Sequence, residues 1–144
     1  MFLRSSVRLA SVALALVVLA PIHLVADEPK VELKGDMKML QGDWVSKDDT
    51  GESTWTFKDD KLTLKTPSRS YDIVVKVDAD AKPNKTMELN VTEASVNAKG
   101  FKGPAIYKFD GDKAVTICFG ADGNRPTEYK TDFQTMFSFD LKKK

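Results

Sequence analysis

Histidine and cysteine each occur once in the 144 residues of this chain. The histidine, His23, lies in an apolar segment near the N-terminus, so the rest of the sequence contains none. Without histidine, the Ser–His and Cys–His pairs of nucleophilic catalysis cannot be assembled, and the commonest transition-metal ligand is missing. We therefore expect a protein that is not an enzyme and that holds no metal or cofactor.

The single cysteine, Cys118, excludes a disulfide bond within the chain, so stability has to come from a hydrophobic core. Cys118 lies in the apolar run AVTICF. This position favours a small buried side chain over a reactive thiol. Arginine is also scarce, and only Arg69 and Arg125 occur beyond the first ten residues. Because arginine dominates the recognition of phosphates and base edges, we do not expect nucleic-acid binding.

The first 26 residues have the order of a secretory signal peptide. Two arginines precede an apolar run at 9–26, which ends at the polar sequence DEP. Pro21 and His23 interrupt this run, so its apolar core is shorter than the roughly 20 residues of a spanning helix. We predict cleavage after Ala26, with a retained anchor as the alternative. The protein would then be exported, periplasmic or extracellular, and without stable membrane insertion.

The remaining chain is balanced in charge. Of 22 basic side chains the predicted signal contains two arginines, which leaves 20 against 21 acidic ones. These charges are scattered, so neither nucleic acid nor an anionic membrane surface is implied. The 118 residues left after cleavage (144 minus 26) suffice for one domain with a core but not for two. We expect a lead-in at 27–38 and one domain at 39–144.

From Gln41 onward, polar and apolar residues alternate with the period of two that is typical of half-buried strands. Before this point, residues 31–40 can form a short helical turn, which Gly35 weakens. A tight turn with positive backbone angles at 110–111, Asp-Gly, predicts a hairpin. A short strand is also predicted at 127–130. The whole pattern indicates about eight strands.

An open meander of eight strands would have two unpaired edges, which a closed barrel avoids. Closure also explains why nearly every strand has one apolar face. We therefore predict an all-β fold, an antiparallel up-and-down barrel preceded by the short helical turn. Eight strands enclose an interior that side chains just fill, or that holds one small ligand. The inward side chains are bulky, which favours a packed or only partly hollow interior.

Four sequence motifs follow one another along this domain. They are LQGDW at 40–44, YKFDGDKAVTICF at 107–119, GNRPTEY at 123–129 and the closing FDLKKK. In this order they resemble an uncharacterised lipocalin-like domain family that is abundant in planctomycete bacteria. The resemblance covers about residues 39–143. It implies an exported small β-barrel with no established activity, substrate or catalytic residue.

The tripeptide Gly42-Asp43-Trp44 is similar to the Gly-x-Trp of true lipocalins. In those proteins the tryptophan closes the base of the barrel, and an arginine near the last strand stacks on it. This chain ends in lysines instead. The resemblance therefore implies that Lys142 or Lys143 covers the indole of Trp44 through a weaker cation contact.

Three function classes remain, and the first is binding of a small apolar ligand by inward aromatic side chains. That function needs a cavity of about 300 Å³ or more. A packed interaction or scaffolding module for an envelope protein would instead show an exposed apolar patch. An enzyme would depend on carboxylates, Tyr or Lys, and no spacing proposes a site. The candidate ligand-binding residues are Trp44, Trp55, Phe57, Tyr71, Tyr107, Phe137 and Phe139.

The segment RPTE at 125–128 is the strongest polar candidate, because it joins a rare arginine to a carboxylate beside a glycine-rich loop. Arg125 and Glu128 are candidates for a partner or anion site. The alternative is that Pro126 sets the entry to a strand, while Arg125 pairs with a nearby carboxylate and fastens the loop.

Overall fold

The computed structural model describes residues 33–144 as eight strands and one short helix. The predicted signal peptide and its cleavage site lie outside the described residues. Within the described part, no helix is long and apolar enough to cross a membrane. The elements are α1 (Asp36–Leu40), β1 (Gly42–Asp48), β2 (Gly51–Lys58), β3 (Lys61–Lys65), β4 (Ser70–Asp78), β5 (Lys85–Ala94), β6 (Lys102–Phe109), β7 (Ala114–Gly120) and β8 (Met136–Lys143).

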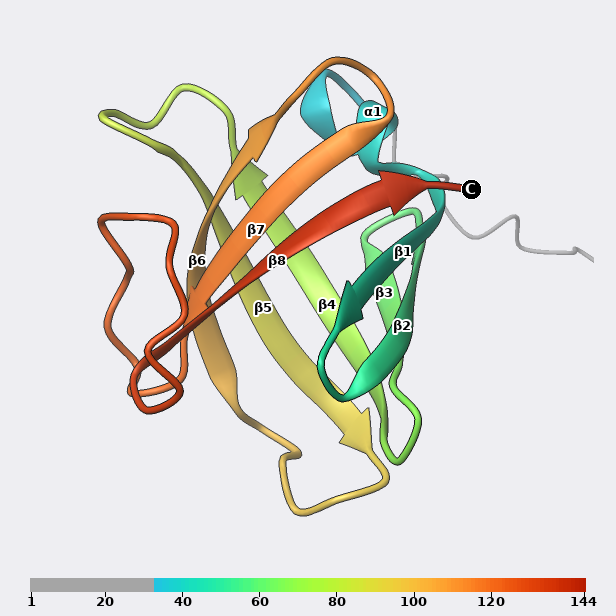
Figure 1. The fold of residues 1–144 in the computed structure, drawn as a ribbon. Helices are drawn as coiled ribbons and strands as arrows, with labels where there is room; N and C mark the ends of the chain where they lie inside the picture. The colour runs from blue at the N-terminus through green and yellow to red at the C-terminus, as the bar shows by residue number, and fades with distance from the viewer. Residues whose placement is uncertain (1–32) are drawn as a thin grey trace, which may run out of the picture. The chain divides into compact units, whose positions relative to one another are not determined.

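The strands form one closed antiparallel barrel in chain order, in which β8 pairs back with β1 (Figure 1). The predicted up-and-down barrel with a short helix before it is confirmed. The strand predicted at 127–130 is wrong, because these residues belong to the connection between β7 and β8. Both edges of β7 are already paired, with β6 and β8, so no strand position beside it is free for this segment.

The alternation of side chains sets the register of the strands. Trp44 lies opposite Trp55 on β1 and β2, and Tyr107 lies opposite Ile117 on β6 and β7. The hairpin between β6 and β7 is present, but of its Asp-Gly pair only Gly111 has a positive φ, 71°. The difference from the predicted tight turn arises because the connection spans four residues, 110–113.

One end of the barrel is closed by α1, which lies at the top of Figure 1. Trp44 is fully buried beneath this helix, and its Nε1 donates a hydrogen bond to the Leu40 carbonyl oxygen at 2.7 Å. Lys143 Nζ lies 5.3 Å from the centroid of the Trp44 ring, as expected for the lysine contact. Leu62, Met87 and other buried side chains fill the barrel below, so this half is packed.

The seam between the first and last strands is short. In the described chain, β1 and β8 pair at two positions, Trp44 with Lys143 and Val45 with Lys142. Further along β8, the Thr131 hydroxyl accepts a hydrogen bond from the Ser138 amide at 2.9 Å and donates one to the Ser138 carbonyl at 3.4 Å. A side chain of the β7–β8 connection therefore occupies an edge of β8 that no strand of the barrel pairs.

The same connection, residues 121–135, folds back over the outside of the barrel. It covers Ile106 and Cys118, which point outward from β6 and β7 and are nevertheless fully buried. The Cys118 thiol donates a weak hydrogen bond to the Lys130 carbonyl oxygen, with 3.5 Å between the two atoms. Gly120 permits this fold-back, since a Cβ there would lie 1.7 Å from the Asn124 carbonyl oxygen. Burial of Cys118 was predicted; the sequence alone did not show that a loop buries it.

Candidate functional site

A cavity of about 820 Å³ occupies the end of the barrel opposite α1. Four strand connections surround this end, at 49–50, 66–69, 95–101 and 121–135 (Figure 1). The wall is mainly aromatic and aliphatic, and its apolar side chains are Trp55, Leu64, Pro67, Tyr71, Ile73, Leu89, Val91, Ala98, Phe101, Phe119, Ala121, Phe133, Phe137 and Phe139. The interior is therefore partly hollow, within the range that the sequence predicted.

Small side chains on β1 and β2 help to explain the hollow. Ser46 and Ser53 lie opposite one another in the register of these strands, and both are buried. At the next inward position toward α1, the pair is Trp44 and Trp55. Replacing two indoles by two hydroxymethyl groups leaves space that the surrounding side chains do not fill. The inward serines were not among the bulky inward side chains from which a packed interior was inferred.

The structure separates the seven predicted ligand-binding residues into two groups. Trp55, Tyr71, Phe137 and Phe139 line the cavity. The other three, which belong to the packed half and lie outside the cavity wall, are Trp44, Phe57 and Tyr107. The alternation of the sequence shows which side chains point inward, but it does not give their height along the barrel axis.

Several cavity residues were missed by the sequence analysis. Phe119 continues the inward alternation of Val115 and Ile117, so its position was available from the pattern. Phe101 precedes β6 in a segment that was interpreted as loop, and nothing local marks it as a wall residue. Arg69 lies in the turn before β4, and no sequence pattern around it links it to a cavity.

Aromatic rings from β2, β7 and β8 form one continuous part of the wall. Phe119 stacks on Phe137 and Phe139, with ring centroids 5.6 and 6.0 Å apart, and Phe139 meets Trp55 at 5.3 Å. The indole N–H of Trp55 is already used, because it donates to Ser53 Oγ at 3.1 Å. This wall therefore offers ring faces and edges to a ligand, as apolar pockets do.

The polar groups of the cavity lie mainly at its mouth. Lys47 pairs with Glu52 at 3.7 Å across β1 and β2. Asp48 accepts hydrogen bonds from the Thr50 hydroxyl and amide, which lower the pKa of its carboxyl group. Arg69 also lines the mouth, and among the described residues its guanidinium has no ion pair or hydrogen bond. Among the described residues at the mouth, Arg69 is thus a cation without an ion-pair partner, whereas Lys47 and Asp48 have partners.

Phe133 stands at the same mouth in an unusual conformation. Its φ is 60°, which is rare for a bulky residue, and its side chain is 80 % exposed. The preceding Asp132 holds the turn, since its carboxylate accepts hydrogen bonds from the Thr135 hydroxyl and from the amides of Gln134, Thr135 and Met136. These bonds, led by that of the hydroxyl, hold the pKa of Asp132 well below its usual range. Phe133 is therefore presented on a preformed turn.

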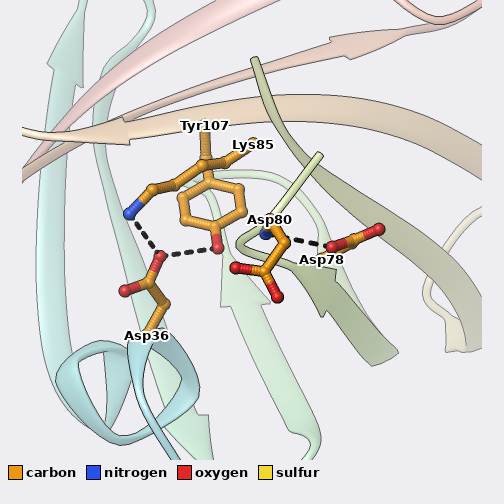
Figure 2. Close-up of polar contacts among 5 residues, drawn as sticks. All are labelled: Asp36, Asp78, Asp80, Lys85 and Tyr107. Carbon is orange, nitrogen blue, oxygen red and sulfur yellow. Dashed lines mark hydrogen bonds and ion pairs between the residues drawn. The ribbon is translucent and has the colours of Figure 1, made fainter. Parts of the chain in front are cut away.

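A second polar cluster lies at the closed end, as Figure 2 shows. Lys85 Nζ and the Tyr107 hydroxyl both donate to Asp36 Oδ2, each at 2.8 Å. Burial alone would raise the pKa of Asp36, but the hydrogen bonds from Lys85 and Tyr107 outweigh it and lower the pKa. Burial, followed by the Asp36 carboxylate, raises the pKa of Tyr107 and keeps the phenol neutral. The cluster ties α1 to β5 and β6.

Arg125 and Glu128 do not form one site. Arg125 pairs with Glu88 on β5 and donates to the carbonyl oxygens of Met87 and Ala105, at 3.2 and 2.6 Å. Glu128 instead pairs with Lys130 at 2.7 Å. These contacts agree with one part of the alternative interpretation, in which Arg125 pairs with a nearby carboxylate and fastens the loop. The other part is wrong, because no strand begins at Pro126 and the next one, β8, starts at Met136.

The part of the chain that the structure describes contains no group of three or more His, Cys, Asp or Glu side chains arranged to hold a metal ion. Comparisons with family models, curated proteins and solved structures find no match to this chain. The candidate site is therefore characterised by its own geometry, an aromatic cavity with a polar mouth.

Proposed function

We propose that the barrel binds a small, largely apolar molecule in the cavity opposite α1. The observation that carries this proposal is a space of about 820 Å³ with an aromatic and aliphatic wall. Ligand pockets span roughly 300–1,000 Å³ and are lined mainly by such side chains. A space of this size is well suited to a ligand.

The packed half of the barrel supports this proposal. Trp44, Tyr107 and Asp36 make their polar contacts at the closed end, away from the cavity. The packed closed end therefore supports the strands that form the cavity wall, and ligand binding does not require the closed end to rearrange. Such separation preorganises a pocket, which lowers the entropic cost of binding.

We also propose that the chain is an exported member of the lipocalin-like family that its motifs resemble. The contact between Lys143 and Trp44 supports this assignment, because it takes the place of the arginine expected over that tryptophan. The export proposal depends on the N-terminal pattern alone.

Binding rather than catalysis is the activity we propose for the cavity. The acidic side chains that line it are Asp48, Asp49 and Asp140. Asp48 caps a turn, and Asp140 accepts a hydrogen bond from the Thr116 hydroxyl at 2.8 Å. These contacts give the two carboxylates structural roles.

A second candidate function is docking of an envelope protein, and Phe133 is the observation that favours it. Among the described residues, the other large exposed apolar side chains are Met39 and Val96, each far less exposed than Phe133. A single exposed ring forms a much smaller patch than the several hundred Å² that mark interaction sites. Ligand binding is therefore the stronger proposal.

Native mass spectrometry of the protein, purified gently from its own exporting host, tests the proposed function directly. A stoichiometric small molecule, identified after organic extraction, is the expected result. A mass equal to that of the bare chain, together with no shift of its melting temperature by apolar compounds, would contradict ligand binding and favour a barrel that acts through its surface.

A cavity-filling variant gives an independent test with the fluorescent probe N-phenyl-1-naphthylamine. Ser46 lines the cavity and is 4 % exposed, so Ser46→Leu places a larger apolar side chain in the space. We expect this variant to lose most probe binding while it stays folded. Val45→Leu, at the outward-facing neighbour on the same strand, is the matched control and should bind like the parent protein. Equal binding by both variants would place the probe elsewhere.

A further inference from the structure

Arg69 indicates the chemical class of the ligand. We propose that the ligand is an anionic amphiphile whose apolar body lies in the cavity and whose charged end binds the Arg69 guanidinium at the mouth. This inference rests on the proposed function, because it assigns an orientation and a charge to a molecule in the same cavity.

The backbone around Arg69 is held firmly. The Thr66 amide donates to the Arg69 carbonyl oxygen at 2.8 Å, and the Arg69 amide donates to the Thr66 hydroxyl at 3.0 Å. The next amide, that of Ser70, donates to Ser95 Oγ at 2.9 Å. The turn at 66–69 is therefore tied to itself and to the neighbouring connection. The Arg69 side chain therefore extends from a backbone position that is fixed at the mouth of the cavity.

Arg69 lies two residues before Tyr71, which is on the cavity face of β4. Arg69 itself belongs to the turn before β4, and it lines the cavity together with Thr66, Pro67 and Ser68 of the same turn. It lines the mouth, and no described carboxylate lies within ion-pair distance of it. An arginine that lies at the polar mouth of an apolar cavity and has no ion-pair partner is available for an incoming anion.

The other charged groups that line the cavity differ from Arg69. Lys47 is the second cation among the cavity-lining residues, and it already pairs with Glu52. Asp48 and Asp140 accept hydrogen bonds from Thr50 and Thr116. Asp49 is a remaining carboxylate on the β1–β2 turn, so its removal belongs in the test.

The distribution of polar atoms fixes the expected orientation of the ligand. Deeper in the cavity the wall is aromatic and aliphatic, and the Trp55 N–H is already bonded to Ser53. An anionic group placed there would lose its hydration without a cation to compensate. At the mouth, the planar guanidinium can bind a carboxylate, sulfonate or phosphate through two parallel hydrogen bonds. The charged end is therefore expected outward.

Two probes that share an aromatic ring system but differ in charge distinguish recognition of the anionic group from binding of the apolar rings. 1-Anilinonaphthalene-8-sulfonate carries a sulfonate, and N-phenyl-1-naphthylamine does not. We expect the parent protein to bind the sulfonate more tightly. Arg69→Gln should lower the affinity for the sulfonate probe about tenfold, which is the typical effect of losing a charge-assisted hydrogen bond. The affinity for the neutral probe should change less than about twofold. Lys76→Gln, at an exposed lysine of β4 that does not line the cavity, is the matched control and should leave both affinities unchanged.

Other outcomes of this experiment overturn the inference. Equal affinities of the parent protein for the two probes, or an equal loss of both in Arg69→Gln, would show that Arg69 does not recognise charge. Tighter sulfonate binding in Asp49→Asn is expected, whereas weaker binding would contradict an anionic ligand. If the neutral probe also fails to bind the parent protein, the proposed function fails together with this inference.

Competition experiments then distinguish the sources of the anion. Dodecanoate and dodecyl phosphate are the charged competitors of the sulfonate probe, and dodecanol is the uncharged one. Displacement by either anion at concentrations where dodecanol has no effect supports the inference and identifies a carboxylate or a phosphate end. Equal displacement by dodecanol and the anions contradicts it.

Discussion

The two halves of the barrel use the same strands in opposite ways. Near α1, inward side chains such as Trp44, Tyr107 and Met87 fill the interior completely. Toward the other end, seven of these strands, all but β6, line an open cavity of about 820 Å³. The alternation of polar and apolar residues is alike in both halves. What differs is the size of individual side chains and the way in which each end is covered.

Polar contacts show the same division. At the closed end, the Trp44 N–H, the Tyr107 hydroxyl and the Asp36 carboxylate all have partners within the chain. At the open end, the Arg69 guanidinium has no described partner, and Phe133 is held exposed. Polar side chains that bond to other parts of the chain stabilise the fold, whereas side chains without such partners can bind a ligand. The comparison teaches that one half of a small barrel can hold the fold while the other half remains available for binding.

The largest expected effect is on the packed half. Trp44→Ala should lower the free energy of unfolding by about 3–5 kcal/mol, because it leaves a large void and removes the hydrogen bond to Leu40. Trp55→Ala should cost less, since one side of Trp55 already faces the cavity. Urea unfolding followed by circular dichroism measures both. Equal losses would contradict the division into packed and hollow halves.

Asp36→Asn should lower the free energy of unfolding by about 1–3 kcal/mol, because it weakens the bonds from Lys85 and Tyr107 at a partly buried site. Asp80→Asn is the control at the same end of the barrel (Figure 2). The Asp80 amide bonds to Asp78, and this contact does not involve the side chain that is changed. Urea unfolding at neutral pH should therefore show little change for the control. A loss equal to that of Asp36→Asn would indicate a general charge effect.

The contribution of Asp36 should depend on pH. Its pKa in the folded protein lies below the ordinary value of 3.8, so the contribution is complete above about pH 4 and is lost as the pH falls through the folded-state pKa. The difference in unfolding free energy between the parent protein and Asp36→Asn should therefore shrink on acidification. Unfolding in urea at a series of pH values measures it. A difference that grows toward low pH would contradict the assignment.

The outer loop should loosen when Arg125 is replaced. In the folded protein, burial raises the pKa of the Cys118 thiol, so we expect slow reaction with 5,5′-dithiobis(2-nitrobenzoic acid). Arg125→Ala removes the contacts with Glu88 and two carbonyl oxygens, and it should speed this reaction severalfold with a stability loss of about 1 kcal/mol. Arg69→Ala is the matched control and should react like the parent protein. Unchanged reactivity in Arg125→Ala would show that other contacts hold the loop.

The smallest expected effect on stability is that of Phe133→Gly. Glycine adopts a positive φ without strain, and the exposed ring contributes little packing, so the unfolding free energy should change by less than about 1 kcal/mol. Affinity for N-phenyl-1-naphthylamine should fall if the ring covers a bound molecule. Probe titration and urea unfolding separate the two effects. Full probe affinity would assign Phe133 to a role outside the cavity.

The fold was largely accessible from the sequence because period-two alternation and turn residues act locally. The pairs of Tyr107 with Ile117 and of Phe109 with Val115 follow directly from that pattern. The strand expected at 127–130 failed for a nonlocal reason. Its alternating residues lie in a loop that packs against the outside of the barrel, and the Tyr129 ring lies 4.4 Å from Lys108 Nζ.

The candidate site was predictable only in part. Trp55 and Tyr71 were identified as inward aromatics, and they do line the cavity. Arg69 was not identified, since an isolated arginine in a turn has no pattern that links it to an opening. The hollow itself depends on how Ser46 and Ser53 face each other across two strands and on where β1 and β8 separate. Both are properties of three-dimensional packing.

The short seam between β1 and β8 has a consequence for how the protein folds. Closure of the barrel joins Trp44 and Val45 to Lys143 and Lys142, residues from opposite ends of the domain. Contacts between such distant parts of a chain form late and slowly, because the intervening segment has to be ordered first. During synthesis, the barrel cannot close until its last few residues have been made. Until then, the unclosed sheet has two exposed β edges, which are prone to aggregate. Pairing of the lysine-rich β8 with β1 removes both edges.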